Sequence, residues 1–304
     1  MRSLVCCWHN YVPHLDHKYF DVLYDYFLRS LEKWGKEVDR IYLLDSTWDI
    51  KRVPDHTTIV RVDPNKRYWE AYEDIIPQLG GDVVFVDNDF LILQEGVLDH
   101  YFNQLDKHEV VSIYDTLGTF TEMINAKWPV MGGKTKFCPY FFMTQASVLQ
   151  SIPDLKLGTI HYEPNTYIKE LDYTTKEGDW GETLGEATIK LLDWGVNPLE
   201  VPEDKSSIYI DGHHDQKLGC GYYHIRAGAT PAYLLTHRNL GDRKTYDDYI
   251  ANQPKSELLR QMAWYWYMNE SIPKSDILEV VNDCGYNHED WKKYIRRFKK
   301  FHEI

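Results

Sequence analysis

The stretch Asp82-Val83-Val84-Phe85-Val86-Asp87-Asn88-Asp89-Phe90 decides how the rest of the chain is interpreted. Its apolar run is β-branched and aromatic, follows Gly80-Gly81 and is too short for a helix, so it predicts a fully buried strand. Such strands are typical of α/β sheets, which bind ligands at the carboxyl ends of their strands. The run ends in two carboxylates, so the sequence places two acids where an α/β protein binds its ligand.

Asp87 and Asp89 are spaced i and i+2, and carboxylates in this arrangement suit a hard divalent cation. Mg²⁺ and Mn²⁺ favour carboxylate oxygens and usually share their coordination shell with phosphate. The pair therefore suggests a metal ion that holds a nucleotide diphosphate. The alternative is an ordinary turn after a strand, because Asp and Asn are common turn residues.

Patterns along the first ninety residues alternate between strand and helix. We expect strands at 4–8, 38–44, 57–62 and 83–86, and helices at 14–34 and 66–76. This order predicts an α/β layer sheet of the nucleotide-binding kind. Later segments predict strands at 110–114, 137–143 and 207–210, helices at 147–152 and 186–194, a loop or flap at 116–136, and two or three helices from 244 to the end.

Composition excludes several classes of protein. The chain has 304 residues and a formal net charge of −13, which disfavours general nucleic-acid binding. Its 5 cysteines are odd in number and lack CxxC spacing, which argues against a disulfide framework or a structural zinc site and fits a reducing compartment. We find no signal-peptide pattern and no apolar run of membrane-spanning length, so we expect a cytoplasmic protein.

A second motif lies at 219–228, where His224 is followed by Arg226 and Gly228. Histidine is a common ligand of transition-type divalent ions such as Mn²⁺, and arginine binds phosphate oxygens bidentately. A lone histidine is more often structural, but an Asp-x-Asp earlier in the chain strengthens the interpretation as a ligand.

These features together resemble the GT-A class of nucleotide-sugar glycosyltransferases, over roughly residues 1–238. The resemblance rests on the N-terminal α/β half, on Asp87-Asn88-Asp89 after a hydrophobic strand, and on the downstream His224 beside a basic residue. It implies an α/β fold with a GT-A-like, Rossmann-type mixed sheet flanked by helices. We expect a catalytic domain at 1–240 and a C-terminal helical extension at 241–304.

The resemblance also implies roles for individual residues. Asp87, Asp89 and His224 would bind Mn²⁺ or Mg²⁺. Asp87 would also bind the nucleotide-sugar donor, and Arg226 would contact the diphosphate of that donor. By their positions after the first and second strands, Trp8, His9, Asn10 and Asp45 would touch the nucleoside.

An inverting reaction also needs a carboxylate that takes the proton from the acceptor hydroxyl. The segment Gly178-Asp179-Trp180-Gly181-Glu182-Thr183 resembles the loop that supplies this base in some inverting members, although Thr183 stands where those members carry an acid. Glu182 is the first candidate for the base and Asp179 the second. The alternative is a helix start, where an acid in the first turn is favoured by the helix dipole.

The segment 291–301 is a basic amphipathic helix pattern, with Trp291, Tyr294, Ile295, Phe298 and Phe301 on one face. Such a helix can bind an anionic membrane surface, which would suit a lipid-linked acceptor. The alternative is a helix docked on the core with a solvated basic face.

We therefore expect a glycosyltransferase that moves a sugar from a UDP- or GDP-linked donor to a glycan or glycolipid hydroxyl, as in polysaccharide biosynthesis. Whether it inverts or retains stays open. The rivals are a nucleotidyltransferase that makes nucleotide sugars, a non-catalytic glycan-binding protein and a metallohydrolase. The first usually carries a glycine-rich N-terminal loop, and this chain has 8–13 in that place, without glycine.

Overall fold

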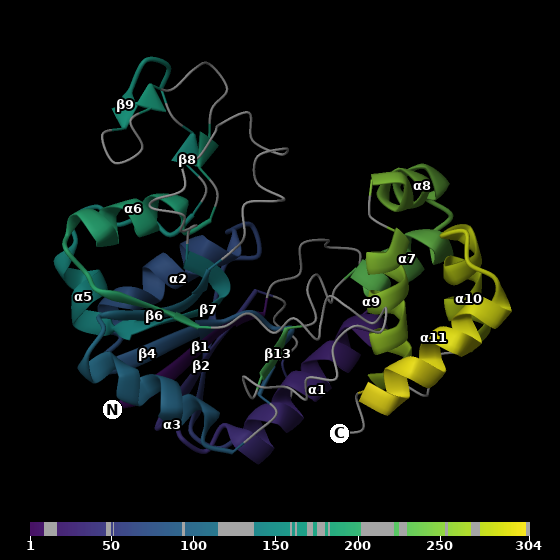
Figure 1. The fold of residues 1–304 in the computed structure, drawn as a ribbon, viewed down its shortest axis with the longest axis horizontal. Helices are drawn as coiled ribbons and strands as arrows, with labels where there is room; N and C mark the ends of the chain where they lie inside the picture. The colour runs from purple at the N-terminus through teal and green to yellow at the C-terminus, as the bar shows by residue number, and fades with distance from the viewer. Residues whose placement is uncertain are drawn as a thin grey trace. The chain divides into compact units, whose positions relative to one another are not determined.

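The strand predicted at 83–86 is β4 (Asp82–Val86), which lies in the middle of a seven-stranded sheet (Figure 1). The computed structural model describes residues 1–8, 17–46, 50, 52–92, 95–114, 137–158, 160–161, 163–168, 173–174, 180–181, 183–201, 222–224, 230–252, 255–268 and 274–301. The other strands of the sheet are β1 (Arg2–Trp8), β2 (Arg40–Asp45), β3 (Thr57–Arg61), β6 (Val110–Tyr114), β7 (Phe137–Gln145) and β12 (Pro198–Val201).

The strand order is β12-β6-β7-β4-β1-β2-β3. Every neighbouring pair in it is parallel except those of β7, which runs antiparallel to both β4 and β6. The chain places β2 and β3 on one side of β1 and then returns to place β4 on the other side. The order of the sheet therefore reverses between β1 and β4, and open α/β sheets bind ligands at such a reversal.

Helices cover both faces of this sheet. The helices among the described residues are α1 (His17–Trp34), α2 (Tyr68–Ile75), α3 (Val97–Phe102), α5 (Ala146–Ser151), α6 (Gly185–Asp193), α7 (Thr230–Asn239), α8 (Arg243–Asn252), α9 (Lys255–Met268), α10 (Lys274–Asp283) and α11 (His288–Phe301), with 3₁₀ turns η1 (Ile76–Gln78) and η2 (Asn103–Asp106).

Alternation of side chains along the strands divides the core of the sheet between its two faces. On one face, Phe85 and Phe142 lie in a single apolar cluster with residues of α2, α5 and α6. On the other, Phe141 meets Tyr101 of α3, with 5.4 Å between ring centroids. Burial of each large side chain stabilises the fold by about 1.5–3 kcal/mol, so a strand buried on both faces is held firmly.

The chain divides into two compact units, each built from separate segments. The first comprises 1–9, 36–87 and 96–203, and includes the sheet; the second comprises 10–35, 88–95 and 204–304. In the second unit α1 contacts α7, α9 and the short strand β5 (Phe90–Ile92). Its apolar residues recur at helical spacing, as predicted, and Phe27, Leu28 and Leu31 are buried.

The α/β class, the mixed sheet flanked by helices and the C-terminal helices are confirmed. The tail holds α8, α9, α10 and α11 within 243–301, which is more than the two or three helices expected. Short strands were also missed, namely β5, β12, β13 (Tyr222–His224) and the antiparallel pairs β8 (Ile160–His161) with β11 (Trp180–Gly181) and β9 (Tyr167–Ile168) with β10 (Tyr173–Thr174).

Two expected features, the loop at 116–136 and the strand at 207–210, lie outside the described residues. The boundary expected at 240 falls between α7 and α8 in the second unit, and the domain division stays a prediction. Within the described ranges, each helix is too short or too polar to span a bilayer.

Candidate functional site

The carboxyl ends of β1, β2 and β4 lie at one edge of the sheet and carry three of the predicted site residues. Trp8 ends β1 and is paired in register with Asp45, the last residue of β2. On the other side of β1, Cys6 pairs with Val86, so Asp87 follows immediately after the last β1–β4 pair. The first unit thus brings Trp8, Asp45 and Asp87 to the edge at which the sheet reverses.

Asp45 is held inside this edge. Its side chain is 0% exposed and forms an ion pair with Arg61, which lies opposite it on β3 and is 37% exposed. A buried carboxylate is costly unless a partner neutralises it, and the guanidinium supplies that partner. The adjacent Ser46 donates from both its backbone N–H and its hydroxyl to the carbonyl oxygen of Trp8, each at 3.1 Å. These bonds fix the ends of β1 and β2 to each other.

A tyrosine of α2 links the ends of β1 and β4. The backbone N–H of Cys7 donates to the hydroxyl of Tyr72 at 3.2 Å, and this hydroxyl donates to the carbonyl oxygen of Val86 at 3.1 Å. The side chain of Asp87 is near enough to influence both groups. Burial, reinforced by that carboxylate, raises the pKa of the Cys7 thiol and the pKa of Tyr72 well above their ordinary values.

The turn from β4 to β5 contains the two predicted metal-binding acids. Asp87 is half-buried, whereas Asp89 is only 6% exposed. A carboxylate this deeply buried needs compensation from a donor or a cation, and ordinary turn acids usually face water. The carboxylate of Asp89 is thus compensated inside the protein rather than by bulk water.

In the second unit, β5 pairs with β13 in antiparallel register, and His224 lies opposite Phe90. The backbone of His224 is thus brought beside the residue that follows Asp89; its side chain lies outside the described residues. β5 is itself anchored to α1. The hydroxyl of Ser30 donates to the carbonyl oxygen of Ile92 at 2.8 Å and accepts from the N–H of Ile92 at 2.6 Å.

Among the residues whose side chains are described, no group of three histidines, cysteines or acids is placed to hold a metal ion. The predicted set fits such an ion by its chemistry, because two carboxylates and an imidazole suit Mn²⁺, and carboxylates alone suit Mg²⁺. The third member of that set, His224, is the one whose side chain is not described.

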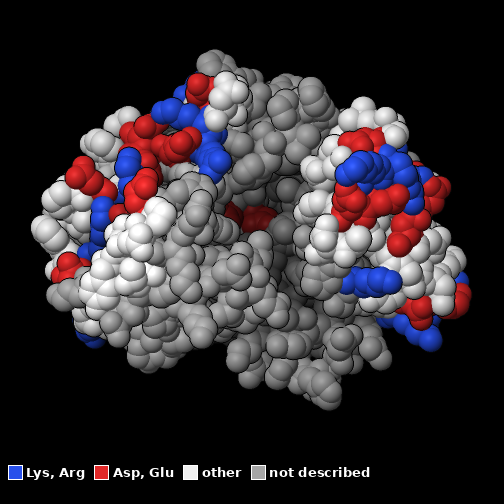
Figure 2. All heavy atoms as spheres, turned by 90° about the horizontal axis from the view of Figure 1, so that it is seen from above, with Lys and Arg blue, Asp and Glu red and all other residues white. Residues whose placement is uncertain are grey.

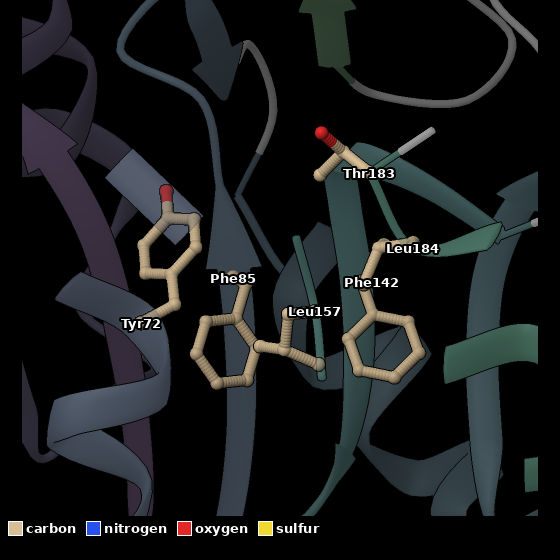
Figure 3. A pocket seen from close by; sticks show the side chains of 6 residues that line it. All are labelled: Tyr72, Phe85, Phe142, Leu157, Thr183 and Leu184. Atoms are coloured by element: carbon tan, nitrogen blue, oxygen red, sulfur yellow. The ribbon is translucent and has the colours of Figure 1, made fainter. Parts of the chain in front are cut away.

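A small apolar pocket lies beside this edge in the first unit (Figure 3). It is lined by Tyr72, Phe85, Phe142, Leu157, Thr183 and Leu184. With room of only about 10 Å³, it is at the lower limit for one water molecule and too small for a substrate. It is best understood as an imperfection in the packing between the sheet and the segment before α6.

The segment before α6 carries the predicted catalytic acids Asp179 and Glu182, which lie outside the described residues. Two other predicted site residues, His9 and Arg226, also lie outside them. The neighbour of Glu182 is described: Thr183 is buried, and its hydroxyl lies 3.4 Å from that of Tyr68. Leu184 has a left-handed backbone with φ of 61°, which is uncommon for a leucine.

Sequence reasoning missed Ser30, Arg61 and Tyr72. A serine inside an amphipathic helix carried a weak signal, because polar residues on a buried face usually have a partner. Nothing in the spacing of Arg61 and Tyr72 distinguished them from an edge-strand charge and a core aromatic.

No protein-family model matches the chain, and no curated protein matches it. Solved structures do resemble it. Bifunctional IspDF from Campylobacter jejuni is 14% identical with a TM-score of 0.42, and the match covers 67% of this chain and 50% of that one. This chain therefore spans half the length of that protein.

Two transferases are among the other similar structures. Mannosyltransferase PcManGT from Pyrobaculum calidifontis, solved with GDP-Man and Mn²⁺, is 10% identical with a TM-score of 0.40, covering 97% of this chain and 72% of its own. Galactosyltransferase LgtC, solved with donor and acceptor sugar analogues, is 10% identical with a TM-score of 0.41, covering 75% of this chain and 88% of its own. At these TM-scores the similarities carry no conclusion about activity.

Proposed function

We propose that this chain is a metal-dependent glycosyltransferase that moves a sugar from a nucleotide-sugar donor to a glycan or glycolipid hydroxyl. The observation that carries the proposal is the place of Asp87-Asn88-Asp89. It follows the central strand β4 directly, at the edge where the sheet order reverses between β1 and β4. Ligands of open α/β sheets bind at such a point.

In this proposal Asp87, Asp89 and His224 hold Mn²⁺ or Mg²⁺, and Arg226 contacts the donor diphosphate. The register of β13 against β5 supports the choice of His224, because it brings that residue opposite Phe90. A divalent ion bound there would act as a Lewis acid and stabilise the negative charge of the departing nucleoside diphosphate.

The nucleoside end of the proposed site is formed by Trp8, His9 and Asp45, after β1 and β2. Because the Asp45 carboxylate is buried and paired with Arg61, we propose that it acts there by holding the guanidinium in place. Glu182, with Asp179 as the second candidate, would accept the proton of the acceptor hydroxyl if the reaction inverts. The donor would be UDP- or GDP-linked.

The proposed acceptor is a glycan or a lipid-linked glycan, and α11 bears on the second alternative. Its residues Trp291 and Ile295 are buried within the second unit, so they are not available to enter a membrane. Lys292, Lys293 and Arg296 are exposed and would be free to make an electrostatic contact with anionic lipids.

A thermal-shift screen of UDP, GDP, CMP and dTDP, each with and without Mn²⁺, tests the proposal. A ligand that binds only the folded state stabilises it by about 2.7 kcal/mol when present at about 100 times its dissociation constant. We expect one nucleotide to raise the melting temperature only when Mn²⁺ is present, and Asp89→Asn to abolish that rise. Asp82→Asn is the matched control, because Asp82 lies at the opposite end of β4.

Other outcomes point to the rivals. If Asp82→Asn and Asp89→Asn retain the same melting-temperature shift, the turn between β4 and β5 takes no part in nucleotide binding. Release of pyrophosphate from a nucleoside triphosphate and a sugar phosphate would identify a nucleotidyltransferase instead. The absence of any nucleotide shift would refute the transferase and favour a glycan-binding protein or a metallohydrolase.

A further inference from the structure

The hydroxyl of Tyr72 joins two strands at the edge where the proposed donor would bind. It accepts a hydrogen bond from the N–H of Cys7 and donates one to the carbonyl oxygen of Val86, at 3.2 and 3.1 Å. The last registered pair of β1 and β4 is Cys6 with Val86. The hydroxyl therefore bridges the strands at the level where their pairing ends.

The tyrosine ring that carries this hydroxyl is buried and packed against two other rings. The side chain is 4% exposed, and its ring meets Phe85 and Tyr68 edge-on at centroid distances of 5.2 and 5.9 Å. A tyrosine hydroxyl keeps its proton at neutral pH, because its ordinary pKa is about 10. The bond to Val86 is therefore present throughout the physiological range.

Each backbone group that the hydroxyl binds belongs to the residue just before a proposed site residue. Cys7 precedes Trp8, and Val86 precedes Asp87. A change in the separation of Cys7 and Val86 therefore moves Trp8 and Asp87, each of which is one peptide unit away. Displacements of these side chains by well below 1 Å matter, because the groups of a binding site must be held within about 0.5 Å of their working geometry.

We infer that Tyr72 is a positioning residue: its hydroxyl sets the separation of the β1 and β4 ends, and with it the placement of Trp8 against Asp87. The inference rests on the proposed function, since it assigns Tyr72 no contact with the donor or the metal ion. It acts on the site only through the two backbones that it binds.

The test compares Tyr72→Phe with Tyr68→Phe. Both variants keep the ring and remove one hydroxyl from α2, but the hydroxyl of Tyr68 lies 3.4 Å from that of Thr183, in the segment before α6. Calorimetric titration with the Mn²⁺-nucleotide chosen by the screen gives the dissociation constant and the stoichiometry separately. Hydrogen exchange of the Cys7 amide reports the bridge without any ligand.

We expect Tyr72→Phe to weaken Mn²⁺-nucleotide binding about tenfold at unchanged stoichiometry, as loss of an outer partner of a metal site does. The Cys7 amide should exchange at least about tenfold faster, because its acceptor is gone. Tyr68→Phe should leave both quantities within about twofold of the wild type, because the hydroxyl it removes lies against Thr183, which belongs to neither β1 nor β4.

Three outcomes overturn the inference. If the wild type binds and Tyr72→Phe binds equally well, the proposed function stands but Tyr72 positions nothing. A reduced stoichiometry with an unchanged dissociation constant means that the hydroxyl only stabilises the fold. A wild type that binds no nucleotide refutes the proposed function, and the inference with it, whatever the exchange of Cys7.

Discussion

At the scale of single residues, the edge of the sheet is set by polar groups in an apolar surrounding. Asp45 is the clearest case, because its fully buried carboxylate faces Arg61 across the β2–β3 register. Removing one partner of a buried ion pair is strongly destabilising, since the other charge stays buried without compensation.

Arg61→Gln should therefore lower the free energy of unfolding by about 3 kcal/mol, measured by urea denaturation. Arg29→Gln is the control, because Arg29 is 66% exposed and its pair with Asp25 lies on the surface of α1. That variant should match the wild type. Similar losses in the two variants would contradict the assignment of Asp45 as a buried, paired charge.

Gly81, just before β4, has a φ of 68° and lies so close to the chain start that an added Cβ would be 2.1 Å from the carbonyl oxygen of Met1. A backbone atom cannot rotate away as a side chain can. Gly96 also has a positive φ, 80°, but an added Cβ there would meet nothing within 4 Å.

We expect Gly81→Ala to lower the free energy of unfolding by at least about 3 kcal/mol, because clash and left-handed strain add. Gly96→Ala should cost only about 1 kcal/mol, which is the strain alone. Paired urea titrations measure the difference, and equal costs would show that Met1 moves aside.

At the scale of elements, the sequence predicted what apolar spacing determines. The strands of the first ninety residues and helices α1 and α2 occur where periodicity placed them. The three-residue strands β5 and β13 were missed because so short a run carries no period, and they exist by pairing with each other across more than a hundred residues. Their pairing is a tertiary effect that local pattern cannot contain.

The candidate site was predictable to a similar depth. Acids after a buried strand can be recognised locally, so the sequence alone suffices to propose Asp87 and Asp89, and the pairing of β13 with β5 brings the backbone of His224 opposite Phe90. The burial of Asp45 and the two bonds of Tyr72 depend on neighbours distant in sequence. The roles of all the proposed site residues, Asp87, Asp89, His224, Asp179, Glu182 and Arg226, stay predictions.

The packing of α11 distinguishes the two alternatives that its sequence left open, a membrane-binding helix and a helix docked on the core. Trp291 is 1% exposed and meets Trp266 of α9 with 6.1 Å between ring centroids. Its neighbours Lys292 and Lys293 are exposed, and Lys292 bonds Glu289 at 2.9 Å. The described apolar residues of this helix thus serve the core of the second unit.

Trp291→Ala should reduce the free energy of unfolding by about 3–5 kcal/mol, because it leaves a large cavity beneath α11. Lys293→Ala, on the opposite face, should leave it unchanged within error. Chemical denaturation followed by circular dichroism separates the two. A harmless Trp291→Ala would mean that α11 is not docked through this residue.

At the scale of the whole molecule, both units contain buried thiol or phenol groups that ionise only at high pH. Burial raises the pKa of Cys7 in the first unit and of Tyr246 and Cys284 in the second, the last from 9.0 to about 11. The unfolded thiol of Cys284 loses its proton near pH 9, whereas the folded thiol keeps it to about pH 11. Over that interval the unfolded state binds fewer protons, so stability falls as pH rises.

The free energy of unfolding should therefore be steady near neutrality and decline above about pH 9. In Cys284→Ala the decline between pH 9 and 11 should be less steep by up to about 1.4 kcal/mol per pH unit. Urea titrations at half-unit intervals of pH measure the slope. An unchanged slope in the variant would show that the folded thiol ionises as readily as the unfolded one.

Charges on the surface are mixed in sign despite the net charge of −13. Figure 2 shows basic and acidic side chains interspersed on the described part of one face, and in α8 Arg243 and Lys244 lie within 2.9 Å of Asp247 and Asp248, respectively. Such pairs contribute little to stability individually and weaken further with salt.

The partners of α1 have a consequence for how the chain is made. This helix packs against β5, which follows it soon in the chain, and also against α7 and α9, which begin only at Thr230 and Lys255. At synthesis rates of about 5–20 residues per second, the part of its apolar face that α7 and α9 cover stays exposed for on the order of tens of seconds. The nascent chain is therefore a natural client for chaperones that shield single amphipathic helices, and slowing translation before residue 255 should lengthen that dependence.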